Sequence, residues 1–221
     1  LKSFWRNLKM FDSIIFDLDG TLWDSTVPIC ESWNVVLKRH AEIKRPPVTI
    51  NELGECMGLP MYDIAAKLFP LESKEVQTAI MDELCEYENE YLSEHGARLF
   101  DGLENVLSLL SKRYRLFIVS NCQDGYIEAF LKAHRLAKYF DDTECWGRTR
   151  TCKGESNKIL IKRNNLCNPV YAGDTSGDAE SADYAGIPFI YAAYGFGNVS
   201  SDKYIAKIDD IKNLPELMEE L

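Results

Sequence analysis

The sequence lacks a paired-cysteine pattern. Its seven cysteines are odd in number and scattered along the chain, and none forms a CxxC pair. A disulfide framework and a structural zinc site both need regularly spaced cysteines, so this distribution argues against both. Reduced thiols in the cytoplasm are the simpler interpretation, and we expect a cytoplasmic protein.

The chain also lacks basic clusters and long apolar runs. It carries 25 Lys and Arg against 35 Asp and Glu, a formal net charge of −10. Proteins that neutralise nucleic-acid backbones need clustered Lys and Arg, so we expect no nucleic-acid partner. The apolar runs are strand-sized and far below the roughly 20 residues of a membrane span, so we expect no membrane partner. Leu1–Lys9 has no signal-peptide apolar region, and we interpret it as leftover or misassigned sequence before a natural start at Met10.

What the sequence does contain is an alternation of helix and strand signals. This pattern predicts an α/β fold with a Rossmann-like, mainly parallel sheet and helices on both faces. The predicted strands are Ser13–Phe16, Arg115–Ser120, Glu144–Trp146, Val170–Gly173, Pro188–Ala192 and Tyr204–Ile208. Helices are predicted at Leu103–Leu110, Gly125–His134, Glu155–Asn164, Asp178–Ala185 and Asp210–Leu221.

The stretch of residues 25–95 has almost no strand signal and predicts an inserted helical unit. Its helices are expected from Ser25 or Thr26 to about Ala41, from the capping box Thr49–Glu52 to near Gly58, over Pro60–Phe69, and from Ser73 onward. The sequence therefore predicts an α/β core of residues 10–24 and 96–221, with a helical cap of residues 25–95. Such an insert would lie over the carboxyl edge of the first strand, where open α/β sheets bind ligands.

Polar clusters follow three of the predicted strands. They are Asp17–Leu22, Ser120-Asn121 and Gly173–Asp178, and Lys153 lies in a predicted loop. Because parallel strands end at one edge of the sheet, these groups are expected to converge. Carboxylates suit Mg²⁺, which prefers oxygen ligands. One carboxylate can attack phosphorus and form an acyl phosphate, while a second serves as general acid and base.

These motifs resemble those of the haloacid dehalogenase-like hydrolase superfamily, and specifically its phosphoglycolate phosphatase-like branch. DLDGTL resembles the family's first motif, the strand end at Ser120 its second, Lys153 its third and GDTSGD its fourth. They occur in the family's order between about Ser13 and Ile190. The helical insert resembles the family's smaller cap type, and the stretch SNCQDGYIEAFL resembles sequences of the same branch.

The resemblance implies roles for the acidic residues. Asp17 would be the nucleophile and a magnesium ligand. Asp19 would be the general acid and base, and its backbone carbonyl would also bind the metal. Asp174 would be the third protein ligand, and Asp178 would bind the metal through water or orient Lys153.

The resemblance also implies how the phosphoryl group is held. Ser120 and Lys153 would contact its oxygens, and Gly20, Thr21 and Asn121 would add substrate contacts. The third motif departs from the branch pattern, which often has prolines after the lysine where this chain has Gly-Glu-Ser. Lys158 is a weaker candidate for the same role.

Other functions remain open at this point. A sugar phosphomutase of the superfamily would carry a histidine near the position of Ile29, and no histidine lies between Asp17 and His40. A dehalogenase lacks the second aspartate, present here as Asp19. A phosphonate hydrolase would need a cap lysine, for which the candidates are Lys38, Lys44 and Lys67. A receiver domain would carry its phosphorylated aspartate on the third strand.

The sequence thus predicts a magnesium-dependent phosphomonoester hydrolase that acts on a small phosphorylated metabolite, with a monomer as the default state. The loop Cys56–Pro60 has two compatible interpretations. It is a helix–helix turn with Gly and Pro as stop and start, and the resemblance implies that it faces the active site and helps to choose the substrate.

Overall fold

The computed structural model describes residues 11–221, and the interpretation of Leu1–Lys9 and Met10 lies outside them. Its main sheet has six parallel strands in the order β5-β4-β1-β6-β7-β8. The strands are β1 (Ser13–Phe16), β4 (Arg115–Ser120), β5 (Asp142–Cys145), β6 (Pro169–Gly173), β7 (Phe189–Ala192) and β8 (Ala206–Ile208). The first strand therefore lies in the interior of the sheet, between β4 and β6.

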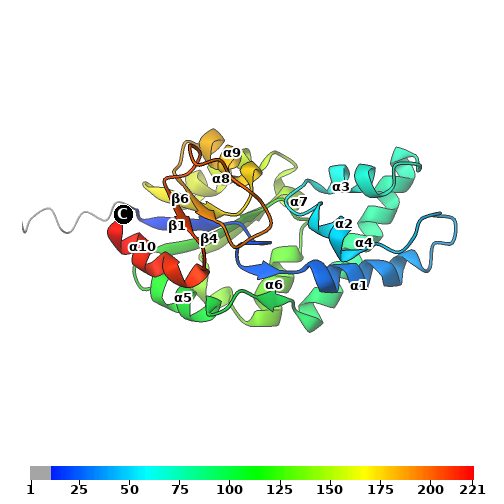
Figure 1. Ribbon diagram of the computed structural model, residues 1–221, viewed down its shortest axis with the longest axis horizontal. Coiled ribbons are helices and arrows are strands. Elements are labelled where there is room, and N and C mark those ends of the chain that lie inside the picture. Colours follow the sequence, from blue (N-terminus) through cyan, green and yellow to red (C-terminus); the bar gives the residue numbers. More distant parts are fainter. Residues whose placement is uncertain (1–10) are drawn as a thin grey trace, which may run out of the picture.

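Helices cover both faces of this sheet, so the predicted fold class is confirmed. The helices α8 and α9 lie on one face and α5, α6 and α10 on the other, as Figure 1 shows. The helices of the α/β part are α5 (Leu103–Leu110), α6 (Tyr126–His134), α7 (Trp146–Thr149), α8 (Lys153–Asn164), α9 (Ser176–Ala185) and α10 (Leu214–Glu220). Short 3-10 turns lie at Ala137–Tyr139 and Ile211–Asn213.

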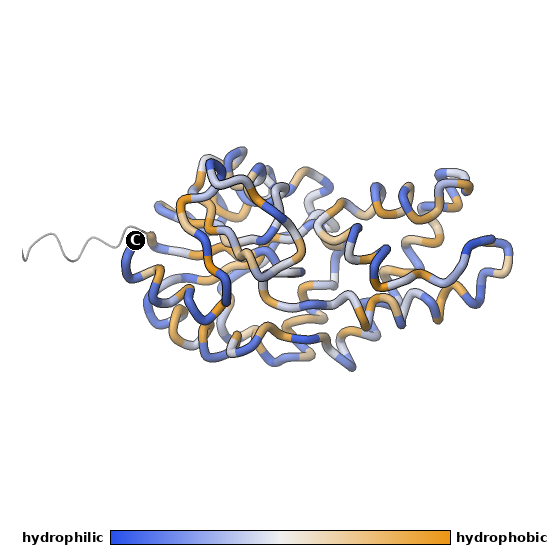
Figure 2. Tube along the Cα trace, in the orientation of Figure 1, coloured by the Kyte–Doolittle hydropathy of each residue, from blue (hydrophilic) through white to orange (hydrophobic). Residues whose placement is uncertain are grey.

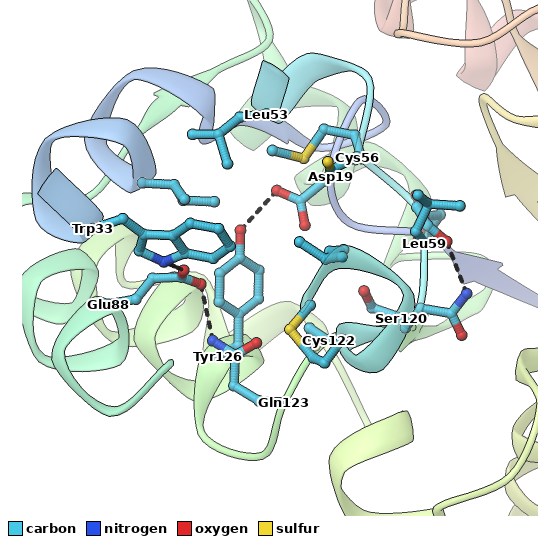
Figure 3. Close-up of a pocket in the computed structure, with 17 residues that line it drawn as sticks. Asp19, Trp33, Leu53, Cys56, Leu59, Glu88, Ser120, Cys122, Gln123 and Tyr126 are labelled. Carbon is cyan, nitrogen blue, oxygen red and sulfur yellow. Dashed lines mark hydrogen bonds between the residues drawn. The ribbon is translucent and has the colours of Figure 1, made fainter. Parts of the chain in front are cut away.

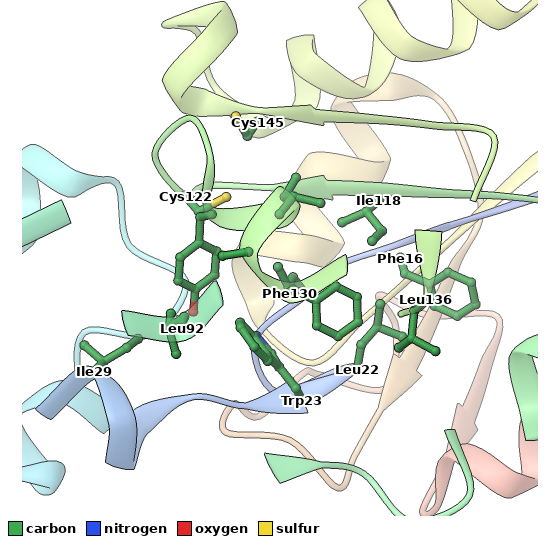
Figure 4. Packing of buried hydrophobic residues seen from close by; sticks show 14 of the residues in the cluster. Phe16, Leu22, Trp23, Ile29, Leu92, Ile118, Cys122, Phe130, Leu136 and Cys145 are labelled. Atoms are coloured by element: carbon green, nitrogen blue, oxygen red, sulfur yellow. The ribbon is translucent and has the colours of Figure 1, made fainter. Parts of the chain in front are cut away.

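Strand periodicity divides the core into two apolar layers. Ile14 and Phe16 pack on the α5–α6 side, whereas Ile15 packs on the α8–α9 side because neighbouring side chains of a strand point to opposite faces. Figure 4 shows the first layer continuing through Trp23 and Phe130, whose rings meet edge to face at 5.0 Å between centroids. Hydropathy changes every few residues along the trace in Figure 2. No helix within residues 11–221 is both long and apolar enough to cross a bilayer.

A group of four helices extends from the α/β part beyond one end of the sheet (Figure 1). They are α1 (Thr26–Leu37), α2 (Ile50–Gly54), α3 (Met61–Leu68) and α4 (Lys74–His95). The chain enters and leaves this helical unit through an antiparallel pair, β2 (Trp23–Asp24) with β3 (Arg98–Leu99). The sequence did not predict this ribbon, because two-residue strands carry no periodic signal. The division into two domains stays a prediction.

Several boundaries differ from the sequence prediction. The first helix of the insert ends at Leu37 instead of near Ala41. The strand expected at Glu144–Trp146 is β5, with the polar sequence DTEC, and Trp146 begins α7. The helix expected from Glu155 begins at Lys153, so Lys153 lies in the first turn of α8 and not in the predicted loop. The last helix begins only at Leu214, with Pro215 in its first turn.

The helix α5 offers a matched test of the core. Leu107 is fully buried, whereas Leu109 on the same helix is 52% exposed. Leu107→Ala should lower the free energy of unfolding by about 2–5 kcal/mol, since it removes packed methyl groups and leaves a cavity. Leu109→Ala should change it by less than about 1 kcal/mol. Urea unfolding monitored by circular dichroism measures both, and equal losses would contradict this assignment of the core.

Candidate active site

Three buried carboxylates meet at the carboxyl edge of the sheet. Asp17 directly follows β1, Asp174 directly follows β6, and Asp178 lies in the first turn of α9. One ligand atom from each can be chosen so that all lie within 4.8 Å of one another. The parallel arrangement of β1 and β6 brings together residues that are more than 150 positions apart in the sequence. The sequence predicted this convergence.

Lys153 lies between two of these carboxylates. Its Nζ donates to Oδ1 of Asp17 and to Oδ1 of Asp178, each at 2.5 Å, and its side chain is only 6% exposed. Burial acts to lower the pKa of Lys153, but the two aspartates outweigh it and hold the pKa well above its usual value. For Asp178, burial acts to raise the pKa, but the charge of Lys153 together with the hydrogen bonds from Lys153 and Thr175 lowers it below its usual value.

Among the cluster's own groups, one lysine faces three carboxylates. Burial and the neighbouring Asp178 raise the pKa of Asp17 well above its usual range, and the same two causes raise the pKa of Asp174 to about 7. Such shifts indicate negative charge that the protein alone does not balance. A hard divalent cation fits this all-oxygen donor set. Asp17 and Asp174 would hold it, together with the backbone carbonyl of Asp19.

Close packing positions the Asp174 carboxylate. The Phe196 N–H donates to its Oδ2 at 2.7 Å, and the Thr21 hydroxyl lies 3.4 Å from its Oδ1. Gly20 has a positive φ of 84°, and a Cβ there would overlap the Asp174 carboxylate and the Phe196 ring. Gly20 and Thr21 therefore help to fix the position of the Asp174 carboxylate in this structure. Their predicted contacts with substrate stay predictions.

Asp178 has two structural duties. Its Oδ2 accepts hydrogen bonds from the backbone N–H groups of Asp174 at 3.2 Å and Thr175 at 2.9 Å, and it completes the capping box of α9. Its Oδ1 takes the hydrogen bond from Lys153. These contacts favour the orientation of Lys153, one of the two roles that the resemblance implied. Lys158, the weaker candidate for the role of Lys153, has its Nζ over the Tyr184 ring, 4.0 Å from the ring centroid. The lysine that contacts the aspartates is Lys153.

Asp19 is held by two hydroxyl groups. Its Oδ1 accepts hydrogen bonds from the Ser25 hydroxyl and, at 2.8 Å, from the Tyr126 hydroxyl. Burial raises the pKa of Asp19, although these two hydrogen bonds oppose the shift. Sequence reasoning missed both partners. It placed the start of the helix at Ser25 or Thr26; Ser25 does occupy the N-cap position of α1, but its side chain makes no capping hydrogen bond there. Tyr126 falls in the stretch SNCQDGYIEAFL, whose resemblance was the only available signal.

A cavity opens beside Asp17 and Asp19, between the helical unit and the sheet edge (Figure 3). Ser120, buried at the end of β4, and Asn121 form part of its wall. The Asn121 side-chain amide donates to the carbonyl of Gly58 at 2.9 Å, so the site is tied to the loop Cys56–Pro60. Lining residues from the helical unit are Ile29, Trp33, Leu53, Cys56, Met57, Gly58, Leu59, Met61, Ile64 and Glu88.

Glu88 adds a further buried carboxyl, which sequence reasoning did not single out. It lies on α4 and accepts hydrogen bonds from the Trp33 indole N–H and, at 2.8 Å, from the Gln123 amide. Figure 3 shows these three side chains at the end of the cavity away from Ser120. Burial raises the pKa of Glu88 to about 8, against the effect of its two hydrogen bonds. The sequence of α4 mixes polar and apolar residues, so the spacing of Glu88 along the helix does not reveal that its side chain is buried or which residues it contacts.

This geometry defines an α/β protein with an acidic, lysine-containing site at the carboxyl edge of its sheet. The family model described as haloacid dehalogenase-like hydrolase matches residues 14–192. The chain belongs to this family and is a hydrolase, as the sequence resemblance implied.

Curated relatives cover almost the whole chain. A phosphoglycolate phosphatase of Xylella fastidiosa is 26% identical over 216 residues, which span 93% of this chain and 90% of the relative. A phosphoglycolate phosphatase of Agrobacterium fabrum is 27% identical over 193 residues, spanning 84% and 82%. These relatives agree with the branch that the sequence resembled.

Solved structures share the fold. A haloacid dehalogenase-like family hydrolase from Streptococcus pneumoniae superposes with a TM-score of 0.79 at 20% identity, covering 95% of this chain and 99% of that one. CbbY from Rhodobacter sphaeroides, solved in complex with phosphate, gives a TM-score of 0.81 at 15% identity, covering 96% and 100%. Both include the helical unit as well as the sheet, since almost all of this chain is covered.

The buried carboxyl of Glu88 predicts a pH dependence of stability. In the unfolded chain its pKa is about 4.3, and in the folded protein about 8, so the folded state holds the proton more tightly. The contribution of this proton binding to the free energy of unfolding is therefore complete below pH 4 and is lost as the pH rises toward 8. Relative to Glu88→Gln, the wild type should lose on the order of 1 kcal/mol or more between pH 5 and pH 8.

Urea unfolding at several pH values measures this difference. Glu90→Gln on the exposed side of the same helix is the control, and its stability should follow the wild type at every pH. Parallel curves for the wild type and Glu88→Gln would contradict the raised pKa.

Proposed function

We propose that this hydrolase is a magnesium-dependent phosphomonoesterase that works through a phospho-aspartate on Asp17 and acts on a small phosphorylated metabolite. The observation that carries the proposal is the buried contact of Lys153 with Asp17, beside carboxylates that suit a divalent cation. The curated relatives named phosphoglycolate phosphatase support the reaction class. A monomer in the cytoplasm, without nucleic-acid or membrane partners, remains our expectation.

The residues divide the chemistry between them. Lys153 occupies Oδ1 of Asp17, which leaves Oδ2 as the atom that attacks phosphorus. As the P–O bond to the leaving group breaks, Asp19 donates a proton to the departing oxygen. Asp19 then takes a proton from water that attacks the acyl phosphate, and phosphate and free Asp17 result. When bound, the magnesium ion supplies positive charge that stabilises the phosphoryl oxygens.

Other groups prepare the site for these steps. The hydroxyls of Ser25 and Tyr126 orient the Asp19 carboxyl, and burial keeps its pKa above the usual value, so that it can carry the proton. Ser120 and Lys153 face the position of the phosphoryl group, where fixed donors and charge stabilise the transition state. The contact of Asn121 with Gly58 holds the loop Cys56–Pro60 over the site, and such coverage excludes bulk water.

The rival phosphomutase has less support. That class would carry a histidine near Ile29, and Ile29 is buried and lines the cavity as an apolar side chain. Among the described residues, no histidine lines the cavity. The cavity wall therefore lacks the histidine that a phosphomutase would carry there. This favours water, rather than a second substrate hydroxyl, as the acceptor of the phosphoryl group.

The reaction class can be tested by phosphate release from a panel of small phosphate esters, with magnesium or with a chelator. Magnesium-dependent release is expected, and the chelator should abolish it. Magnesium should also raise the melting temperature of the wild type but not of Asp174→Asn, because that change removes a ligand carboxylate. Release that is unaffected by chelation would contradict the proposed cation dependence.

Substitution of the two aspartates separates their roles. Asp17→Asn should abolish turnover, by at least about 10³-fold, since it removes the nucleophile. Asp19→Asn should slow turnover by about 10²–10⁴-fold and, if the second step slows more, accumulate phospho-enzyme. Single-turnover assays and intact-protein mass spectrometry measure both effects. Substantial activity in a folded Asp17→Asn protein would remove Asp17 as nucleophile.

A further inference from the structure

We propose that the leaving group of the substrate is a small uncharged alcohol that carries a hydrogen-bond donor, held by Gln123, and that a carboxylate-bearing leaving group is disfavoured. This inference rests on the proposed phosphatase function and specifies its substrate class. It departs from the acidic substrate for which the curated relatives are named.

The position of Asp19 shows where the leaving group lies. A general acid must reach the departing oxygen, so the leaving group occupies the same side of the phosphoryl position as Asp19. Asp19 lines the cavity below the loop Cys56–Pro60. It does not line the neighbouring cavity, which borders Lys153 and Arg150. The first cavity therefore receives the leaving group.

The wall of this cavity has no positive charge to meet a carboxylate. Within residues 11–221, no Lys, Arg or His lines it, and its charged side chain beyond the catalytic aspartates is Glu88. Ionised, Glu88 would repel a carboxylate, and protonated, it would offer no counter-charge. Arg150 lies with the other cavity and stacks on Trp146, 4.4 Å from the ring centroid. A second anionic group on the substrate would thus be buried without a partner.

Gln123 supplies an acceptor in the same wall. Its amide N–H₂ donates to Glu88 at 2.8 Å and to the Asn89 side-chain oxygen at 3.1 Å. The amide of Asn89 in turn donates to the backbone carbonyl of Asp124, which fixes which of its atoms is oxygen. The Gln123 Oε1 is therefore left as a buried acceptor with no hydrogen-bond partner, on a side chain only 9% exposed.

An unpartnered buried acceptor costs free energy until a donor reaches it. Less than 1 Å² of the Oε1 surface is accessible, so a small shift of the Gln123 side chain must expose it before a substrate hydroxyl donates to it. A carboxylate only accepts hydrogen bonds and gains nothing there. The cavity has a volume of about 50 Å³, and a single water needs roughly 10–15 Å³ by this measure. It therefore suits a leaving group of a few heavy atoms, packed against the apolar side chains of the helical unit.

Matched pairs of esters test the charge preference. The pairs are 2-hydroxyethyl phosphate with phosphoglycolate, and glycerol 3-phosphate with 3-phosphoglycerate, each assayed for kcat/KM with magnesium. The hydroxyl member should be favoured at least about tenfold in the better pair. p-Nitrophenyl phosphate is included as an activated ester that reports phosphatase chemistry.

The outcomes separate the two proposals. Hydrolysis of p-nitrophenyl phosphate with equal rates within the pairs, a preference for the carboxylate member or no turnover of either pair would overturn this inference and leave the phosphatase proposal standing. No hydrolysis of any ester by folded protein with magnesium would overturn both.

A second comparison tests Gln123 itself. The wild type should favour 2-hydroxyethyl phosphate over propyl phosphate, which has a methyl in place of the hydroxyl, by about tenfold. Gln123→Met, which removes the acceptor at similar volume, should bring this ratio near one, and Glu90→Gln should leave it at the wild-type value. The ratio of two substrates on one preparation does not depend on the folded fraction. A ratio unchanged in Gln123→Met would overturn the role of Gln123.

Discussion

The ammonium of Lys153, buried between the carboxylates of Asp17 and Asp178, is the interaction on which the site depends. Removing one partner of a buried ion pair leaves the others uncompensated, at a cost of about 3–5 kcal/mol. Asp178 is fixed independently of Lys153, because it also closes the capping box of α9. Asp178, fixed at the start of α9, therefore positions the Lys153 ammonium. Lys153 in turn donates a hydrogen bond to one oxygen of Asp17 and leaves the other oxygen available to the substrate.

Two polar contacts tie the helical unit to this site, in addition to the packing of α4 against α6. The Asn121 amide binds the Gly58 carbonyl, and the Gln123 amide binds Glu88 on α4. The two donors lie just after β4, where the chain turns toward α6. The same short segment therefore shapes the phosphoryl end of the cavity and its far wall, and movement of the helical unit would alter both at once.

Membership of the haloacid dehalogenase-like hydrolase family accounts for the aspartates and the lysine, but not for the wall that faces the leaving group. That wall combines apolar side chains of the helical unit with Glu88 and Gln123. A family name describes the shared chemistry at the sheet edge. The choice among phosphate esters depends on side chains contributed by the insert, where identity of about a quarter to the curated relatives leaves room for a different preference.

The sequence alone determined the α/β class, the helical character of the insert and the convergence of Asp17, Asp174 and Lys153. It could do so because strand periodicity and strand-end motifs are local signals, and parallel strands place their ends at one edge. Only the tertiary structure decided that Ser25 and Tyr126 hold Asp19, that Thr21 contacts Asp174, and that Glu88 and Gln123 meet across the cavity. Most of these contacts join residues that lie far apart in the sequence. Burial, which raises the pKa of Glu88, is likewise a property of the assembled fold rather than of any segment.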